Sequence, residues 1–231
     1  MDNNNVREEQ ECKIVLVGDV KCGKSSLIHR VLHDKFLDVY IPTGFERYTA
    51  TYDVAEQRIN FTVWDTSGSP AYDTVRPLAY QDVRIFLLCF QINRPDSLAN
   101  TLNKWYPEVR QHGPNVPVIL CGCQSDTRQD SDSVSNQSKS KDGVALETSR
   151  QISAATYVET SSKFSSKTAR EAFEVAALAA LGRLNKNHAL IQRDQSYDRT
   201  LERSPFERAR YKSRLDLKAE LRDRTKSCSI M

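Results

Sequence analysis

Gly18-Asp19-Val20-Lys21-Cys22-Gly23-Lys24-Ser25 is the stretch of the sequence that decides the fold. It has the form GxxxxGK[ST], and it stands between a continuous apolar run, residues 12–17, and a helical pattern that begins around residue 27. A glycine-rich loop in this position turns its backbone N–H groups toward phosphate groups, at the positive end of the following helix. The stretch therefore predicts a phosphate site in which Lys24 neutralises β- and γ-phosphate oxygens and the Ser25 hydroxyl binds Mg²⁺.

A second arm of this site is expected where another strand ends, at Trp64-Asp65-Thr66-Ser67-Gly68. In phosphate-transferring proteins with such a loop, a carboxylate at the end of a strand helps to hold the metal ion. We expect Asp65 to reach Mg²⁺ through water and the Gly68 backbone N–H to face the γ-phosphate.

The rest of the pattern alternates strands with helices. Two alternating segments, 48–54 and 59–64, predict an antiparallel hairpin, whereas the apolar runs 85–90 and 116–121 are typical of buried parallel strands. The sequence further predicts helices over 97–109, 144–154 and 167–184, a short strand over 156–159, and a polar surface loop over 128–143. These elements predict an α/β fold: a mostly parallel, six-stranded, doubly wound sheet with helices on both faces and ligands at the carboxyl ends of its strands.

Length and composition indicate one domain with an appended tail. The chain has 231 residues, 39% hydrophobic and 27% charged, and its apolar runs are too short to cross a bilayer. The first ten residues are polar, so they do not form a secretory signal, and a cytosolic protein is expected. Six cysteines without CxxC spacing indicate reduced thiols rather than disulfides or a zinc site.

Residues 12 to about 184, together with the extreme C-terminus, resemble the Rho family of small GTPases, whose small G domain has this phosphate loop. The segment from Phe36 through Tyr40-Ile41-Pro42-Thr43 to Phe45-Glu46 resembles its first switch region. The resemblance implies that Phe36 packs on guanine and that Thr43 binds Mg²⁺ and the γ-phosphate. Residues 64–78, with Tyr72-Asp73 and Val75-Arg76-Pro77-Leu78, resemble the second switch region of the Rnd subgroup. The domains expected are a flexible N-terminus over 1–11, the G domain over 12–185 and a basic tail over 186–231.

The expected base site consists of two short segments. Cys123-Gln124-Ser125-Asp126 stands in the place of the family's Asn/Thr-Lys-x-Asp motif, and Ser161-Ser162-Lys163 resembles its Ser-Ala-Lys/Leu motif. Asp126 would accept the guanine protons, whereas Gln124 replaces a lysine whose stem lies along the base, so guanine selection is expected with reduced affinity. The resemblance assigns nucleotide binding to Val20, Lys21, Cys22, Gly23, Lys24, Ser25, Ser26, Phe36, Tyr40, Thr43, Gly68, Gln124, Asp126, Ser161, Ser162 and Lys163, and metal binding to Ser25, Thr43 and Asp65.

Three positions related to hydrolysis depart from the family. Most cycling members have Gly at Val20, Ala at Ser67 and a water-orienting Gln at Ser69. A serine is too short to hold the attacking water as glutamine does, and the branched side chain of Val20 would crowd an arginine finger, which is worth about 10³ to 10⁵ in rate in small GTPases such as Ras. We therefore expect a protein that stays in its GTP state, with very low or absent hydrolysis.

The tail ends in Cys228-Ser229-Ile230-Met231, which fits the C-a-a-X motif, and methionine in the last position favours farnesylation. By resemblance, carboxyl methylation accompanies the lipid. Residues 186–231 hold 12 basic and 7 acidic residues, which supply a second membrane signal. These features predict a lipid-anchored protein on the cytoplasmic face of the plasma membrane, with a cytosolic pool. The alternative is a solvated helix or linker, and a nucleic-acid-binding tail is disfavoured because few aromatics lie among its basic residues.

Three functions follow from these residues. The preferred one is a monomeric GTP-bound switch; the resemblance implies partners among effectors, Rho-directed GAPs and plexins, with antagonism of Rho signalling, actin rearrangement and loss of adhesion. Phosphorylation near Ser227 with 14-3-3 binding would release it from membranes. An ordinary cycling GTPase and a scaffold that binds no nucleotide remain as alternatives.

Overall fold

The computed structural model describes residues 9–54, 57–128 and 137–184 of the chain. Six strands form one sheet in the order β2-β3-β1-β4-β5-β6. β2 is antiparallel to β3, and every other neighbouring pair is parallel. The strands are β1 (Glu9–Gly18), β2 (Phe45–Val54), β3 (Gln57–Thr66), β4 (Ile85–Gln91), β5 (Val118–Cys123) and β6 (Thr156–Thr160).

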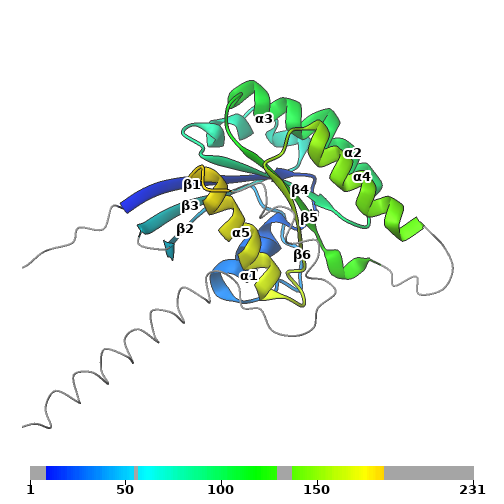
Figure 1. Cartoon of the computed structure of the whole chain (residues 1–231), viewed down its shortest axis with the longest axis horizontal. Helices are drawn as coiled ribbons and strands as arrows, with labels where there is room; N and C mark the ends of the chain where they lie inside the picture. The colour runs from blue at the N-terminus through cyan, green and yellow to red at the C-terminus, as the bar shows by residue number, and fades with distance from the viewer. Residues whose placement is uncertain (1–8, 55–56, 129–136, 185–231) are drawn as a thin grey trace, which may run out of the picture.

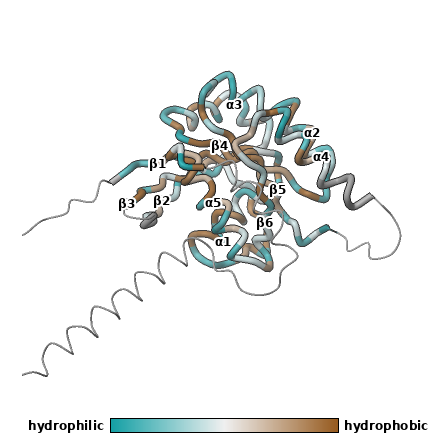
Figure 2. The backbone as a smooth tube through the Cα atoms, viewed as in Figure 1, coloured by the Kyte–Doolittle hydropathy of each residue, from teal (hydrophilic) through white to brown (hydrophobic). Residues whose placement is uncertain are grey.

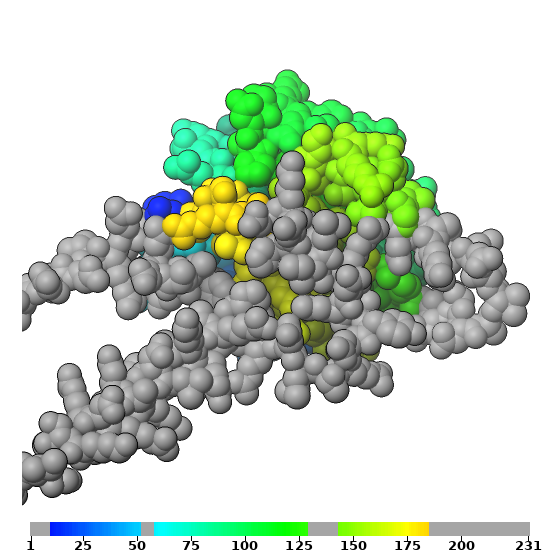
Figure 3. Space-filling view, viewed as in Figure 1, coloured from blue at the N-terminus to red at the C-terminus, as the bar shows by residue number. Residues whose placement is uncertain are grey.

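Helices cover both faces of this sheet, which confirms the predicted architecture (Figure 1). α1 and α5 lie on one face, and α2, α3 and α4 lie on the other (Figure 1). In the space-filling view, the green residues of the α3 and α4 side form the upper part of the molecule (Figure 3). The helices are α1 (Lys24–His33), α2 (Pro95–Asn100), α3 (Tyr106–His112), α4 (Gln137–Gln151) and α5 (Ser166–Ala180). Short helical turns are η1 (Pro70–Tyr72), η2 (Arg76–Tyr80), η3 (Thr101–Trp105) and η4 (Ser125–Thr127). None of the helices within the described ranges is long and apolar enough to cross a membrane.

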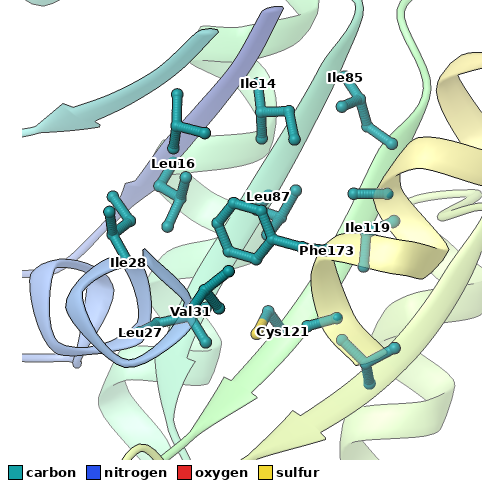
Figure 4. Packing of buried hydrophobic residues seen from close by; sticks show 14 of the residues in the cluster. Ile14, Leu16, Leu27, Ile28, Val31, Ile85, Leu87, Ile119, Cys121 and Phe173 are labelled. Carbon is teal, nitrogen blue, oxygen red and sulfur yellow. The ribbon is translucent and has the colours of Figure 1, made fainter. Parts of the chain in front are cut away.

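Strand β1 shows how the sequence builds two hydrophobic cores at once. Because successive side chains of a strand point to opposite faces, Ile14 and Leu16 enter the core beneath α1 and α5, whereas Val15 and Val17 enter the other. Phe173 of α5 packs among the strand residues of the first core (Figure 4). Hydrophobic residues follow the central strands along the middle of the molecule (Figure 2).

The helix predicted over 97–109 is interrupted in the structure. It is α2, then a π-helical turn η3, then α3, and the Tyr106 N–H bonds to the Thr101 carbonyl, five residues back. Pro107 explains the break: it has no N–H to give to residue 103, and its ring crowds that carbonyl in an α-helix.

The other predicted boundaries also differ from the structure by a few residues; for example, α5 ends at Ala180 rather than residue 184, and β2 begins at Phe45 rather than residue 48. Two of the differences have a physical reason. The polar stretch 128–143 is not all loop, because α4 already begins at Gln137, while residues 129–136 lie outside the described part. A polar composition does not prevent a helix that is anchored further along by Ala145 and Ile152, which are buried. Strand β1 starts at Glu9 rather than residue 12, because its ladder with β3 continues to the Glu9–Arg58 pair.

The strand order places β1 at the point where the chain reverses direction across the sheet. From β1 the chain passes to β2 and returns through β3 on one side, and then crosses to β4 on the other. In doubly wound sheets, ligands bind in the crevice beyond the carboxyl ends of the strands at this point. The loop from Gly18 to Lys24 leaves β1 there.

Candidate functional site

The loop between β1 and α1 has the backbone that its glycines predict. Gly23 has φ of 115°, a left-handed conformation that L side chains rarely adopt, and Lys21 is also left-handed with φ of 65°. A Cβ atom at Gly18 would lie 2.1 Å from the Cys89 carbonyl oxygen. The neighbouring strand β4 therefore leaves no room for a side chain at Gly18.

Lys24 begins α1 and folds back over this loop. Its side chain is buried, and Nζ donates to the carbonyl oxygens of Gly18 (2.8 Å) and Asp19 (2.9 Å). The first turn of α1 holds no acidic residue, so no side chain of the helix itself offsets the positive charge at its N-terminus. An ammonium group and a helix N-terminus that face one loop form a site for phosphate groups.

Asp65 at the end of β3 is the most unusual carboxylate of the site. It is fully buried, and within the described ranges neither of its oxygens has a hydrogen-bond partner. Burial raises the pKa of Asp65 to about 6, although the nearby hydroxyls of Ser25 and Thr43 and the Lys24 ammonium act in the opposite direction. An unpartnered buried carboxylate is unfavourable unless a cation satisfies it.

The oxygens around Asp65 fit such a cation. The Ser25 and Thr43 hydroxyl oxygens lie 2.8 Å apart and come from α1 and from the segment before β2. Carboxylate and hydroxyl oxygens are the hard ligands that Mg²⁺ prefers, and Mg²⁺ usually keeps waters and substrate phosphate as its other ligands. Ser25, Thr43 and Asp65 would hold this ion, and its charge would keep the Asp65 carboxylate ionised.

The segment after β3 lies directly against the phosphate loop. A Cβ atom at Gly68 would lie 2.3 Å from the Gly18 carbonyl oxygen and 2.5 Å from the Val20 nitrogen. The Ser69 hydroxyl accepts from the Ala71 N–H (3.4 Å) and so caps the short helix η1. This bond orients the Ser69 hydroxyl toward the local turn.

A cavity of about 210 Å³ connects these parts. The first switch segment forms its other wall, where the Lys21 ammonium lies 5.1 Å from the centre of the Tyr40 ring. The lining residues are Val20, Lys21, Gly23, Lys24, Ser25, Ser26, Leu37, Asp38, Val39, Tyr40, Ile41, Thr43, Thr66, Ser67, Gly68 and Gln124.

The expected base site is held together beside this cavity. Gln124, in the left-handed conformation with φ of 59°, donates from Nε2 to the Lys21 carbonyl oxygen at 2.9 Å. The Ser161 hydroxyl donates to Asp126 at 2.7 Å, so the two motif segments contact each other. Gln124 therefore links the base segment to the phosphate loop through a neutral amide.

Arg30 of α1 fixes the second of these segments. Its guanidinium donates to the backbone carbonyls of Ser162 and Lys163, and a third bond reaches the Asp34 carbonyl (3.0 Å). The loop that would face the guanine is thus attached to the same helix that begins at the phosphate site.

Not every expected residue lies on the cavity. Asp65, close by, is buried beneath it, and Cys22 points into the core and is 1% exposed. Phe36 is half-buried outside the lining, Asp126 and Lys163 are exposed, and Ser161 and Ser162 are buried in their own loop. Cys228 lies outside the described residues.

Three residues that contribute to the site, Asn100, Trp105 and Arg76, could not be assigned a role from the sequence motifs. Asp19 of the phosphate loop accepts from the Trp105 Nε1–H (2.7 Å) and from the Asn100 side-chain amide (2.8 Å). Arg76, quoted only as part of the second switch pattern, is fully buried against Trp105. The sole sequence signal for this arrangement is Pro107, which predicts an irregular helix at this point.

Comparisons with known proteins agree with this geometry. The Ras family model matches residues 13–181. The chain is 40% identical to the Rho-related GTP-binding protein RhoE of Homo sapiens, Mus musculus and Sus scrofa over 238 aligned positions, which cover 99% of this chain and 93% of each relative. The phosphate loop, the sheet order and these similarities together show that the chain belongs to the Ras family of small GTPases and, within it, to the Rho-related, Rnd-like subgroup.

Proposed function

We propose that this protein is a Rho-type signalling switch that binds GTP with Mg²⁺ and hydrolyses it very slowly or not at all. Lys24 and the start of α1 bind the phosphates, and Ser25, Thr43 and Asp65 hold the metal ion, which neutralises phosphate charge when it is bound. Asp126 selects guanine, with Gln124 in place of the family's lysine. The further nucleotide contacts proposed are those assigned above by resemblance.

The observation that carries slow hydrolysis is the environment of Ser69. Its hydroxyl accepts from the Ala71 N–H, and its side chain is too short to orient an attacking water as a glutamine does. Val20 lines the cavity opposite Ser67 and Gly68, where its branched side chain narrows the space for an arginine finger. Both features act on hydrolysis and leave the phosphate-binding contacts intact.

The surface next to the cavity supports a role in partner binding. Val39 and Ile41 are each 70% exposed, and Leu78 of the second switch is 78% exposed. Exposed aliphatic side chains on segments that contact the nucleotide are suited to report its presence to an effector. Membership of this family implies effector or regulator partners and membrane association in general.

We further propose Rho-directed GAPs and plexins as effectors, with antagonism of Rho signalling, actin rearrangement and reduced adhesion as the result. Farnesyl-modified Cys228 and the basic tail would hold the protein on the cytoplasmic face of the plasma membrane, and 14-3-3 binding after tail phosphorylation would release it. These proposals rest on resemblance to the Rnd subgroup.

The test is to identify the nucleotide released from the purified protein after a day with Mg²⁺, and to measure single-turnover GTP hydrolysis. We expect GTP near one equivalent, and faster hydrolysis in a variant that carries Val20→Gly, Ser67→Ala and Ser69→Gln. A content of mostly GDP in the unaltered protein would indicate an ordinary cycling GTPase. Absence of nucleotide, with no uptake of added GTP, would indicate a scaffold.

A further inference from the structure

The carboxylate of Asp19 in the phosphate loop is held from outside the loop. Trp105 Nε1 donates to one of its oxygens at 2.7 Å, and the Asn100 side chain donates to the other at 2.8 Å. Both donors belong to the interrupted helix of residues 95–112. Two donors on one carboxylate fix the Asp19 side chain of the phosphate loop.

The π-helical turn is what brings both donors to the same carboxylate. In an α-helix, residues five apart point about 140° away from each other. A π-helical turn bonds each N–H to the carbonyl five residues back, so side chains with that spacing come closer to one face of the helix. Asn100 and Trp105 have this spacing, and the turn η3 spans Thr101–Trp105.

Arg76 performs the corresponding task for the second switch. It is 0% exposed; Nε donates to the Ser67 carbonyl oxygen at 2.9 Å, and Nη2 donates to the Ser69 carbonyl oxygen at 3.2 Å. Glu108 accepts from Nη1 with both carboxylate oxygens (2.8 and 3.1 Å), and Asp73 accepts from Nη2. A buried guanidinium needs such complete pairing, so its position is strongly determined.

Trp105 contacts both Asp19 of the phosphate loop and Arg76 of the second switch. The Arg76 guanidinium lies 4.7 Å from the centre of the Trp105 ring, on the same indole whose N–H holds Asp19. Trp105 is 1% exposed, so this stack is enclosed within the protein. The Trp105–Arg76 pair therefore joins the phosphate loop to the Ser67–Ser69 segment, whose Gly68 backbone lies against that loop.

We propose that Trp105 and Arg76 are positioning residues that fix the Ser67–Ser69 segment against the phosphate loop independently of the γ-phosphate, and thereby favour GTP over GDP. This inference rests on the proposed function, in which the Gly68 N–H faces the γ-phosphate. A segment that is already ordered loses less conformational freedom when its ligand binds. Only GTP carries the γ-phosphate, so loosening the segment weakens GTP binding and leaves GDP binding nearly unchanged.

The experiment uses the full chain with Mg²⁺ and compares dissociation of fluorescent GDP with that of a fluorescent, non-hydrolysable GTP analogue. Trp105→Phe removes the N–H that holds Asp19 and retains an aromatic face for Arg76. We expect the GTP analogue to dissociate about tenfold faster, with GDP dissociation changed by less than about twofold. Faster amide hydrogen exchange over residues 67–69 should accompany this change.

Two further variants separate positioning from general stability. Asn100→Ala removes the second donor to Asp19 without a change in the core, and should raise analogue dissociation in the same selective way; it also serves if Trp105→Phe does not fold. Tyr157→Phe is the matched control, because it removes one aromatic donor, to Glu159 at 2.6 Å, on β6. It should leave both dissociation rates unchanged.

Equal acceleration of GDP and analogue release in the two test variants, or no acceleration of either, would overturn the inference. Because the analogue cannot be hydrolysed, rapid GTP hydrolysis by the unaltered protein would refute the proposed locked state and leave this test valid. An unaltered protein that binds neither nucleotide would refute both.

Discussion

Gln124 offers a sharp test of the candidate site, because it replaces a charged residue of the family with a neutral one. Its amide donates to the Lys21 carbonyl oxygen at 2.9 Å and so ties the base segment to the phosphate loop. Gln124→Asn shortens the side chain so that it no longer reaches this oxygen. Asparagine tolerates the left-handed backbone at this position, where φ is 59°, so the change does not add strain.

The expected magnitude follows from the exposure of this bond. A neutral hydrogen bond at a partly exposed position contributes about 0.5 to 1.5 kcal/mol, which corresponds to about a twofold to tenfold change in dissociation rate. Fluorescent GDP should therefore leave Gln124→Asn faster by this factor. Gln124→Lys should slow dissociation by a similar factor, because a charged donor forms a stronger bond with the same carbonyl.

Gln124→Glu is the matched control for shape. It keeps the size of the side chain but places an acceptor where the Lys21 carbonyl needs a donor. This variant should therefore release fluorescent GDP at least as fast as Gln124→Asn. If both variants released GDP at the rate of the unaltered protein while their thermal midpoints stayed the same, the tie between base segment and phosphate loop would have no role in nucleotide binding.

Three further predictions concern the site and the core. Gly68→Ala introduces a Cβ atom 2.3 Å from the Gly18 carbonyl oxygen, and we expect overpacking of about 1 to 3 kcal/mol, measured as about a fivefold to 150-fold loss of affinity for a GTP analogue with GDP affinity largely retained. Burial raises the pKa of the Cys22 thiol to about 12, so very little of it is ionised at pH 8. In a Cys228→Ser variant, a thiol reagent should label Cys22 only on unfolding, and stoichiometric labelling of Cys22 in the native protein, located by peptide mapping, would contradict this. Phe173→Ala should reduce the free energy of unfolding by about 3 to 5 kcal/mol in urea titration, because a ring that is 3% exposed leaves a cavity between α5 and the sheet.

The parts of the fold that depend on local patterns could be predicted from the sequence. The phosphate loop, the apolar central strands and the β2–β3 hairpin each have a motif or a periodicity, and the structure places them as expected. Three residues of the metal site converge for the same reason: Asp65 lies at the end of β3, Ser25 at the start of α1 and Thr43 just before β2.

The holding of the phosphate loop by Trp105 could not be predicted in the same way. Periodicity assumes one helical repeat over residues 97–109, and on that repeat Asn100 and Trp105 point in different directions. The π-helical turn brings them toward one face, and its presence depends on packing in three dimensions. The start of α4 could not be predicted either, since composition alone does not distinguish a polar loop from the polar first turns of a helix.

Through Arg30, helix α1 sets the spacing between the phosphate site and the loop proposed to face the base. Lys24 lies at the phosphate end of the helix, and six residues later Arg30 donates hydrogen bonds to the backbone carbonyls of the loop proposed to face the base. At a rise of about 1.5 Å per residue, Lys24 and Arg30 are about 9 Å apart along the helix axis. The helix thus fixes the distance between the phosphate site and the loop proposed to face the base. Inserting or deleting one residue between Lys24 and Arg30 would rotate Arg30 by about 100° about the helix axis and break its bonds to that loop. The base loop would then lose its attachment even though every residue that contacts the nucleotide is still present in the sequence.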